Sequence, residues 1–179
     1  MARISRLPRH QTAPELQALF EQIESNGSQV LHLYQTLAHC PYLCRDVIRF
    51  GNKLLNKGGV SDTLRELAIL VVSHLTSAKY EQIKHEEIAR QVGVPEDKIA
   101  AVADWNTSTL FDEKERAVLR FAKDTTQQVK ASDEAFDQMR LYFSESEIVE
   151  FTVIVGFYNM ISRILETLGV ELEQNPTAL

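Results

Sequence analysis

The segment from Ser61 to Gly93 places the strongest constraint on how this chain can fold. It starts with residues typical of a helix start, continues through the apolar run Leu67–Val72 and breaks at Thr76-Ser77-Ala78. A second helical pattern follows and ends at Gly93, a residue type common just past a helix C-terminus. Two helical segments joined by so short a break predict a helical hairpin.

The rest of the chain also has a helical pattern. Apolar residues recur at three- and four-residue spacing, Pro14, Pro41 and Pro95 stand at helix starts, and sustained alternation is absent. We therefore expect an all-α, single-domain bundle of about eight helices built around the hairpin. Residues 1–12 are predicted to form an N-terminal arm in solvent, 13–173 the helical domain and 174–179 a C-terminal tail.

Charge and hydropathy exclude several classes of partner. The net charge of −6 argues against nucleic acid, because neutralising phosphates requires a basic surface. No apolar run approaches the ~18 residues needed to span a membrane, and the N-terminus lacks a signal-type hydrophobic segment. The sequence thus predicts a cytoplasmic protein that binds neither nucleic acid nor membrane.

Glu66 is the first candidate acid–base residue. It stands immediately before the apolar run, and a carboxyl group that enters an apolar site has its pKa raised by desolvation. Such a group suits general acid or base catalysis. The alternative is structural, because acidic side chains in the first turns of a helix interact favourably with its macrodipole.

Glu81 and His85 form a second candidate pair, since residues four apart share a helix face. They could equally be surface contacts. Glu66 and His85 lie nineteen residues apart, so they can meet only if the chain folds back near Ser77. We expect Thr76 or Ser77 to cap the second helix, since Ser and Thr are good N-caps.

Cys40 and Cys44 are one helical turn apart and do not form a C-x-x-C motif. They are interpreted as structural thiols, with the alternative that a helix N-terminus activates one of them. The histidines show no metal-ligand spacing, and phosphate-loop and G-x-S-x-G motifs are absent. We therefore expect neither a metal nor a cofactor.

Several segments together resemble the carboxymuconolactone decarboxylase family, whose superfamily includes the alkyl hydroperoxidase D (AhpD) proteins. The similarity covers about Pro41 to Glu171. The segments are Arg49-Phe50-Gly51-Asn52, Leu64-Arg65-Glu66-Leu67-Ala68-Ile69-Leu70, Ala78-Lys79-Tyr80-Glu81 with His85, Gly93-Val94, and Phe157-Tyr158-Asn159-Met160 with Arg163. The resemblance implies an all-helical fold, assembly into trimers or hexamers, and a pocket around the hairpin.

The resemblance also implies which residues act. In the peroxidase branch a Glu, two cysteines and a His form a proton relay; Glu66 and His85 occupy the first and last positions. The cysteine positions hold Ala78 and Glu81, so thiol peroxidase activity at this site is disfavoured. The cysteine-free decarboxylase branch fits better. It implies catalytic Glu66 and His85, with substrate-binding candidates Ser77, Tyr80, Glu81, Tyr158, Asn159 and Arg163.

The leading hypothesis is a cofactor-free, homo-oligomeric enzyme that uses Glu66 and His85 for decarboxylation or proton transfer on a small organic acid or lactone. One alternative is a peroxidase that uses Cys40 or Cys44. Another is a non-catalytic oligomer that binds a small molecule. If Arg163 is buried in the last helix it needs a carboxylate partner, for which Glu66 and Glu150 are candidates.

Overall fold

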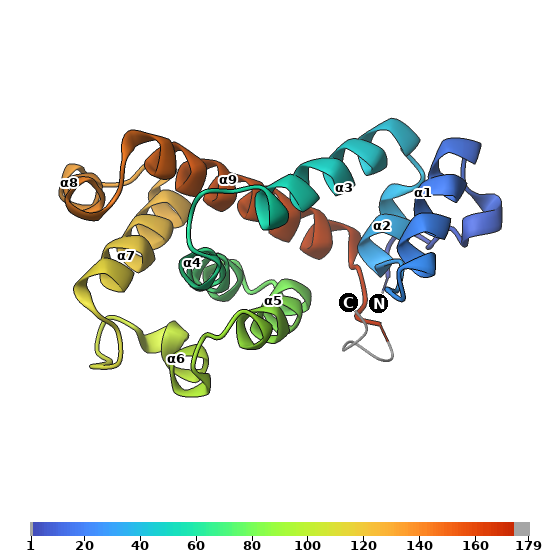
Figure 1. The fold of residues 1–179 in the computed structure, drawn as a ribbon. Helices are drawn as coiled ribbons and strands as arrows, with labels where there is room; N and C mark the ends of the chain where they lie inside the picture. Colours follow the sequence, from blue (N-terminus) through green and yellow to red (C-terminus); the bar gives the residue numbers. More distant parts are fainter. Residues whose placement is uncertain (1, 174–179) are drawn as a thin grey trace. The chain divides into compact units, whose positions relative to one another are not determined.

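The computed structural model describes residues 2–173, in which all regular elements are helices and there is no strand (Figure 1). This confirms the predicted all-α class. In this range there are nine α-helices, close to the eight expected, and two short 3-10 segments. They are η1 (Arg9–Gln11), α1 (Pro14–Ser25), α2 (His32–Leu37), α3 (Pro41–Asn56), α4 (Asp62–Leu75), α5 (Lys79–Gln91), α6 (Glu96–Ala101), η2 (Val102–Asp104), α7 (Glu113–Gln128), α8 (Asp133–Tyr142) and α9 (Glu145–Leu168).

The chain divides into two compact units, each of which is described by itself. Of the described residues, the first unit combines 2–57 with 164–173, and the second contains 58–163. The limits expected for the arm and the helical domain stay predictions. The expected tail, 174–179, lies outside the described residues.

The first unit has its own apolar core. α1, α2 and α3 pack together (Figure 1), and their buried side chains include Leu16, Phe20 and Ile48. The N-terminal segment is bound along its backbone, since the Arg3 N–H donates to the Leu168 carbonyl at 3.0 Å. The side chains of residues 2–6 are nonetheless exposed.

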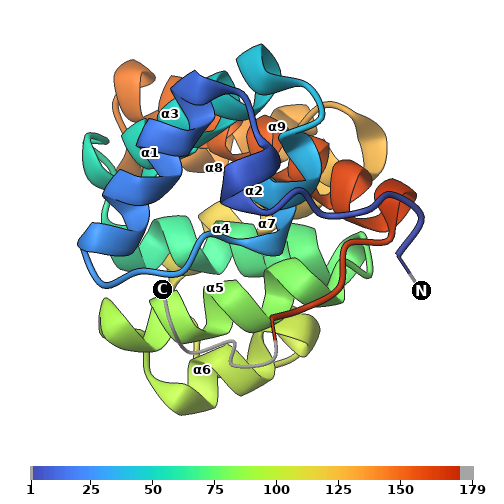
Figure 2. The same cartoon turned by 90° about the vertical axis from the view of Figure 1, so that its right-hand side faces the viewer.

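The second unit is organised around α4. This helix packs against both α5 and α7, and α7 packs against α8. Figure 2 shows α4 and α5 running side by side, as the hairpin prediction requires. Every residue from Leu64 to Ser73 is buried. A helix segment that is enclosed on all sides is apolar around most of its surface, which explains the continuous run Leu67–Val72.

Two of the helix starts have the side-chain caps that their sequences favour. The Asp112 side chain accepts from the Glu115 N–H at 2.8 Å, and the Glu115 carboxylate accepts from the Asp112 N–H at 2.9 Å. Ser132 likewise accepts from the Ala135 N–H at 3.2 Å. Each cap satisfies backbone N–H groups that have no partner inside the helix.

The prediction that Thr76 or Ser77 caps the second hairpin helix is wrong. α5 begins after Ala78, and no side chain caps it. The Thr76 hydroxyl instead donates back to the Val72 carbonyl at 2.8 Å, within α4. Ser77 reverses the chain with a left-handed backbone at φ 56°. Serine and threonine can bond to the preceding turn as readily as to the following helix, and here the preceding turn prevails.

The expectation that no apolar run approaches membrane-spanning length is wrong for α9. By length and composition alone this helix could cross a membrane, because only Glu150 and Arg163 are charged between Ile148 and Leu165. Half of its apolar window is buried inside the protein. The core helix of a soluble protein passes the same test, so α9 is weak evidence for a membrane span.

Val129 holds a strained conformation at the end of α7. Its φ is 68°, and the residue is 89% exposed, so no burial offsets the strain. We expect Val129→Gly to raise the free energy of unfolding by up to about 1 kcal/mol, measured by urea unfolding. The control is Glu21→Gly, at an exposed position inside α1, which should lower stability by about 0.5–1 kcal/mol. A loss of stability in both variants would contradict the interpretation.

Candidate active site

The hairpin of α4 and α5 brings Glu66 and His85 into contact. The His85 Nδ1 lies 2.7 Å from the Glu66 Oε2, a distance at which Nδ1–H donates to the carboxylate. The Glu66 side chain is fully buried, and His85 is 6% exposed. The chain thus folds back near Ser77 in the way that contact between these residues requires. Their catalytic role stays a prediction.

Arg65 holds the other oxygen of the Glu66 carboxylate. Its Nε donates to Glu66 Oε1 at 3.0 Å, and its Nη1 donates to Asp62. Burial alone would lower the pKa of Arg65, but the neighbouring Glu66 and Asp62 carboxylates outweigh it and raise the pKa. A buried guanidinium therefore balances the charge of Glu66. The sequence reasoning missed this role, because adjacent residues of a helix do not normally face each other.

Glu81 lies on the other side of the His85 ring. Its Oε1 is 4.0 Å from His85 Nε2, and its Oε2 accepts from the Ser162 hydroxyl at 3.0 Å. Burial raises the pKa of Glu81 to about 7, although His85 and Ser162 act in the opposite direction. Sequence reasoning missed Ser162. The signal was its position four residues after Tyr158, hence on the same helix face.

Tyr158 completes the group through its ring. The rings of His85 and Tyr158 meet edge to face, with centroids 4.7 Å apart and planes at 86°. Such a contact fixes the plane of the imidazole in addition to the bond at Nδ1. We call these six residues the His85 cluster, namely Arg65, Glu66, Glu81, His85, Tyr158 and Ser162.

Two other predicted substrate-binding residues form a separate pair. The exposed Arg163 donates from Nη1 to the carbonyl and side-chain oxygens of Asn159, at 2.7 and 2.8 Å. Asn159 in turn donates to the Thr126 hydroxyl at 2.9 Å. A carboxylate partner was expected for Arg163 only if this residue were buried. Arg163 is exposed, so it does not need one. Glu150 instead accepts from the Gly59 N–H at 2.8 Å.

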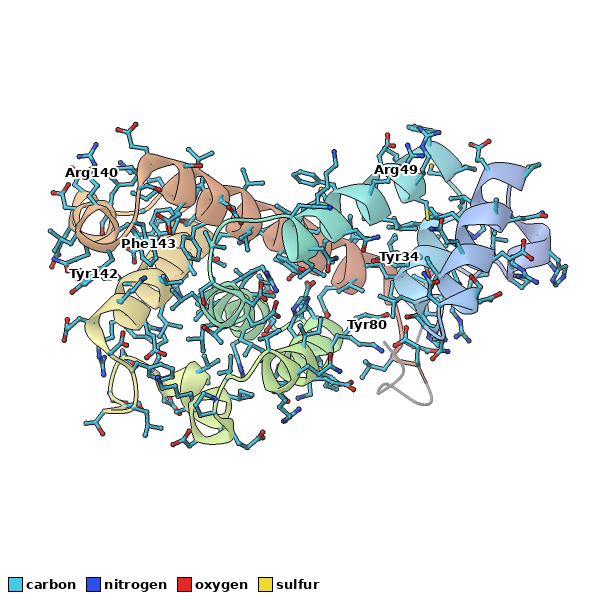
Figure 3. The ribbon with its side chains drawn as sticks, viewed as in Figure 1. Tyr34, Arg49, Tyr80, Arg140, Tyr142 and Phe143 are labelled. Atoms are coloured by element: carbon cyan, nitrogen blue, oxygen red, sulfur yellow. The ribbon has the colours of Figure 1, made fainter. Side chains whose placement is uncertain are left out.

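The remaining two candidates lie at the start of the second hairpin helix. Ser77 is exposed in the turn between α4 and α5. Tyr80 is buried in the first turn of α5, where Figure 3 labels it. Within residues 2–173 no group of three or more His, Cys, Asp or Glu side chains is arranged to hold a metal ion.

The two cysteines belong to the first unit and are not joined to each other. Cys44 is buried, its thiol donates to the Tyr34 carbonyl at 3.4 Å, and burial raises its pKa to about 12. Such a thiol stays protonated at neutral pH and is a poor nucleophile. Cys40 is exposed.

The pKa of Glu81 predicts how stability depends on pH. The folded protein keeps the Glu81 proton up to about pH 7, whereas an unfolded chain loses it near the ordinary glutamate pKa of 4.5. The folded state therefore binds more protons between these values, and stability falls as the pH rises through that window. We expect the contribution of Glu81 to the free energy of unfolding to fall by up to about 3 kcal/mol between pH 4 and 8.

Urea unfolding of the wild type and Glu81→Gln at several pH values measures this effect. Glutamine does not titrate, so the difference between the two proteins isolates residue 81. A difference that stays constant across the window would contradict the assignment of a raised pKa.

Solved structures with the same fold are AhpD-like proteins. An AhpD-core peroxidase-related protein from Ralstonia eutropha JMP134 has a TM-score of 0.86 and 18% identity, covering 98% of this chain and 94% of that chain. An Agrobacterium tumefaciens protein described as a putative antioxidant defence protein AhpD has a TM-score of 0.71 and 26% identity. The match covers 75% of this chain and 93% of that chain. The debrominase Bmp8, solved in complex with 2,3,4-tribromopyrrole, has a TM-score of 0.82 and 23% identity, covering 98% and 94%. The protein is therefore an all-helical member of the AhpD-like fold class.

Sequence comparison leads to a family within that class. The carboxymuconolactone decarboxylase family matches residues 41–124, the segment that contains Glu66, Glu81 and His85. This segment is slightly less than half of the chain, and within it the protein is similar to the carboxymuconolactone decarboxylase family. The uncharacterized protein YdfG of Bacillus subtilis is 24% identical over 119 residues, 65% of this chain and 81% of YdfG. The uncharacterized protein YnjA of Escherichia coli is 28% identical over 110 residues, 56% of this chain and 60% of YnjA.

Proposed function

We propose that the protein is a cofactor-independent acid–base enzyme that acts on a small organic acid or lactone by decarboxylation or proton transfer. The observation that carries this proposal is the setting of His85. A fully buried carboxylate holds its Nδ1 at 2.7 Å, and its Nε2 faces a second buried carboxyl group at 4.0 Å. A carboxylate that orients an imidazole in this way is the usual arrangement of a catalytic base or acid.

The chemistry follows from this arrangement. When a carboxylate group leaves as carbon dioxide, the electron pair of the broken bond stays on the substrate and must be delocalised and then protonated. Protonated His85 gives the carbon its proton from Nε2, while Glu66 keeps hold of Nδ1–H and stabilises the imidazolium. Arg65 balances the charge of the Glu66 carboxylate through their 3.0 Å contact. Tyr80 and Glu81 would contact polar groups of the substrate.

Peroxide reduction is the weaker alternative, although several structures of this fold carry peroxidase or antioxidant descriptions. That reaction needs a thiolate nucleophile and a resolving thiol. Ala78 and Glu81 supply neither, and Cys44 is protonated at neutral pH. The debrominase has the same fold as well, which illustrates that a fold supports different reactions and the site decides between them.

We also propose a cytoplasmic homo-oligomer, a trimer or hexamer, with no nucleic acid or membrane partner. One face of α9 supports the assembly, because Val149, Val153 and Met160 lie on it at helical spacing and are 63%, 37% and 41% exposed. Light scattering at micromolar concentration is expected to give a mass several times that of one chain. A monomer would contradict the assembly, and Val153→Lys should weaken it.

Decarboxylation of γ-carboxymuconolactone by the wild type and by His85→Gln tests the proposed activity. Loss of product in the variant supports the acid–base role. If the protein is a non-catalytic binder instead, the two proteins will be alike in every property except stability.

A further inference from the structure

Glu81 has a position that substrate binding alone does not explain. Its carboxyl group is buried, at 4% exposure, and lies between two groups of different chemistry. Oε2 accepts a hydrogen bond from Ser162 Oγ, whereas Oε1 faces His85 Nε2 across 4.0 Å. That distance is too long for a hydrogen bond, so Oε1 and Nε2 face each other without bonding.

Ser162 determines which oxygen of Glu81 carries a proton. In a carboxylic acid one oxygen is a carbonyl acceptor and the other a hydroxyl donor. Because Ser162 donates to Oε2 at 3.0 Å, the acid form of Glu81 has its hydroxyl at Oε1. The acidic hydrogen is thereby directed to the side where His85 Nε2 lies.

The surrounding charges allow the acid form to exist near neutral pH. The titratable and charged groups of the cluster are Arg65 and Glu66 on α4, His85 on α5 and Tyr158 on α9, and Lys84 is buried on α5 next to His85. Arg65 and Glu66 neutralise each other through their 3.0 Å contact. Burial then dominates and raises the pKa of Glu81 to about 7, so both of its protonation states are populated at neutral pH.

We propose that Glu81 is a second catalytic residue, which donates a proton from Oε1 to a carbonyl oxygen of the substrate while His85 serves the adjacent carbon. The proposal rests on the proposed acid–base function and deepens it. The 4.0 Å between Oε1 and Nε2 suits two groups that contact atoms only one or two bonds apart in one small molecule.

The step is balanced as follows. The bond between the substrate carbon and its carboxylate breaks, carbon dioxide leaves, and the electron pair moves onto the conjugated carbonyl oxygen. The Glu81 O–H bond breaks as the oxygen takes its proton, which leaves an enol and a Glu81 carboxylate. When His85 Nε2 protonates the carbon, the enol returns its proton to Glu81. His85 then regains one proton from solvent, so the cycle consumes one proton for each carbon dioxide released.

This role limits the class of substrate. A donor at Oε1 is useful only if negative charge develops on an oxygen. The substrate should therefore be an acid with a carbonyl group conjugated to the reacting carbon, as in a keto acid or an unsaturated lactone acid. An acid without such a carbonyl is expected to bind without reacting.

Glu81→Gln tests the role, because glutamine keeps an acceptor for Ser162 and cannot transfer a proton. With γ-carboxymuconolactone we expect kcat to fall by about 10²-fold or more while KM changes only a few-fold. Glu15→Gln, at an exposed position on α1, is the matched control and should behave as wild type. An unchanged kcat in Glu81→Gln overturns the proposal.

Ser162→Ala tests how Glu81 is positioned. The measurement is the pH profile of activity, which would not shift if Ser162 had only a structural role. The Ser162 hydrogen bond lowers the pKa of Glu81, so its loss should raise that pKa further. Activity that needs the acid form then extends to higher pH, and the alkaline limb of the pH profile moves upward. A profile that keeps its shape and position overturns the role of Ser162.

Two measurements separate this proposal from the proposed function. Infrared spectroscopy should show a protonated carboxyl band that disappears as the pH rises through about 7 and is missing from Glu81→Gln. In D2O the wild type, and not the variant, should speed exchange of the carbon-bound hydrogens next to the carbonyl of 4-oxopentanoate. If the lactone is not decarboxylated but both results appear, the named reaction fails and the role of Glu81 stands. If the band or the exchange is absent, the role of Glu81 is overturned.

Discussion

His85→Gln is expected to lower kcat for γ-carboxymuconolactone by about 10²- to 10⁴-fold, the usual contribution of a general acid or base. Glutamine approximates the length of the side chain and can still hydrogen-bond to Glu66, but it cannot exchange a proton near neutral pH. His85 is also the one residue of the cluster that contacts or faces both buried carboxyl groups. Its loss therefore removes the group that lies between them.

The control for this variant is His10→Gln, which replaces an exposed histidine of η1 in the first unit. Circular dichroism and thermal unfolding should show that both variants are folded. If His85→Gln keeps its kcat while the fold is intact, the acid–base assignment is wrong. If neither the wild type nor the variant releases carbon dioxide, the named substrate is wrong, and proton exchange on other small acids becomes the relevant assay.

Arg65→Leu is expected to lower the free energy of unfolding by about 3–5 kcal/mol. The reason is the charge it leaves behind, because the Glu66 carboxylate is fully buried and Arg65 Nε donates to it at 3.0 Å. Removing one partner of a buried ion pair leaves an uncompensated charge in an apolar surrounding. Urea unfolding near neutral pH measures the change.

The matched control is Arg120→Leu, which breaks the ion pair between Arg120 and Glu134 at 2.8 Å. Those side chains are 40% and 70% exposed, so water screens the pair, and the expected loss is below about 1 kcal/mol. Adding Glu66→Gln to Arg65→Leu should recover part of the lost stability, because the buried charge is then gone. Equal losses in the two arginine variants would show that Arg65 does not compensate a buried charge.

Local patterns were sufficient for much of the fold. Asp112 and Ser132 cap α7 and α8 as their sequences favour, and Pro14 and Pro41 begin helices. These features depend on neighbours within one turn, which the sequence displays directly. The turn near Ser77 shows the limit, since the same residues could bond forward or backward and only the folded chain determines which.

For the candidate site, too, the sequence predicted some of the residues and only the folded structure identified the others. Sequence alone determined an all-α chain with a hairpin, and it singled out Glu66, Glu81 and His85 by their positions in readable patterns. The family resemblance added Tyr158. Only the tertiary structure decided that Arg65 and Ser162 join them. The physical reason is that helix periodicity identifies the residues that share a face. It does not specify which side chains of two different helices meet, or which of them lose contact with water. The charge of Glu66, the proton of Glu81 and the orientation of His85 all depend on those contacts.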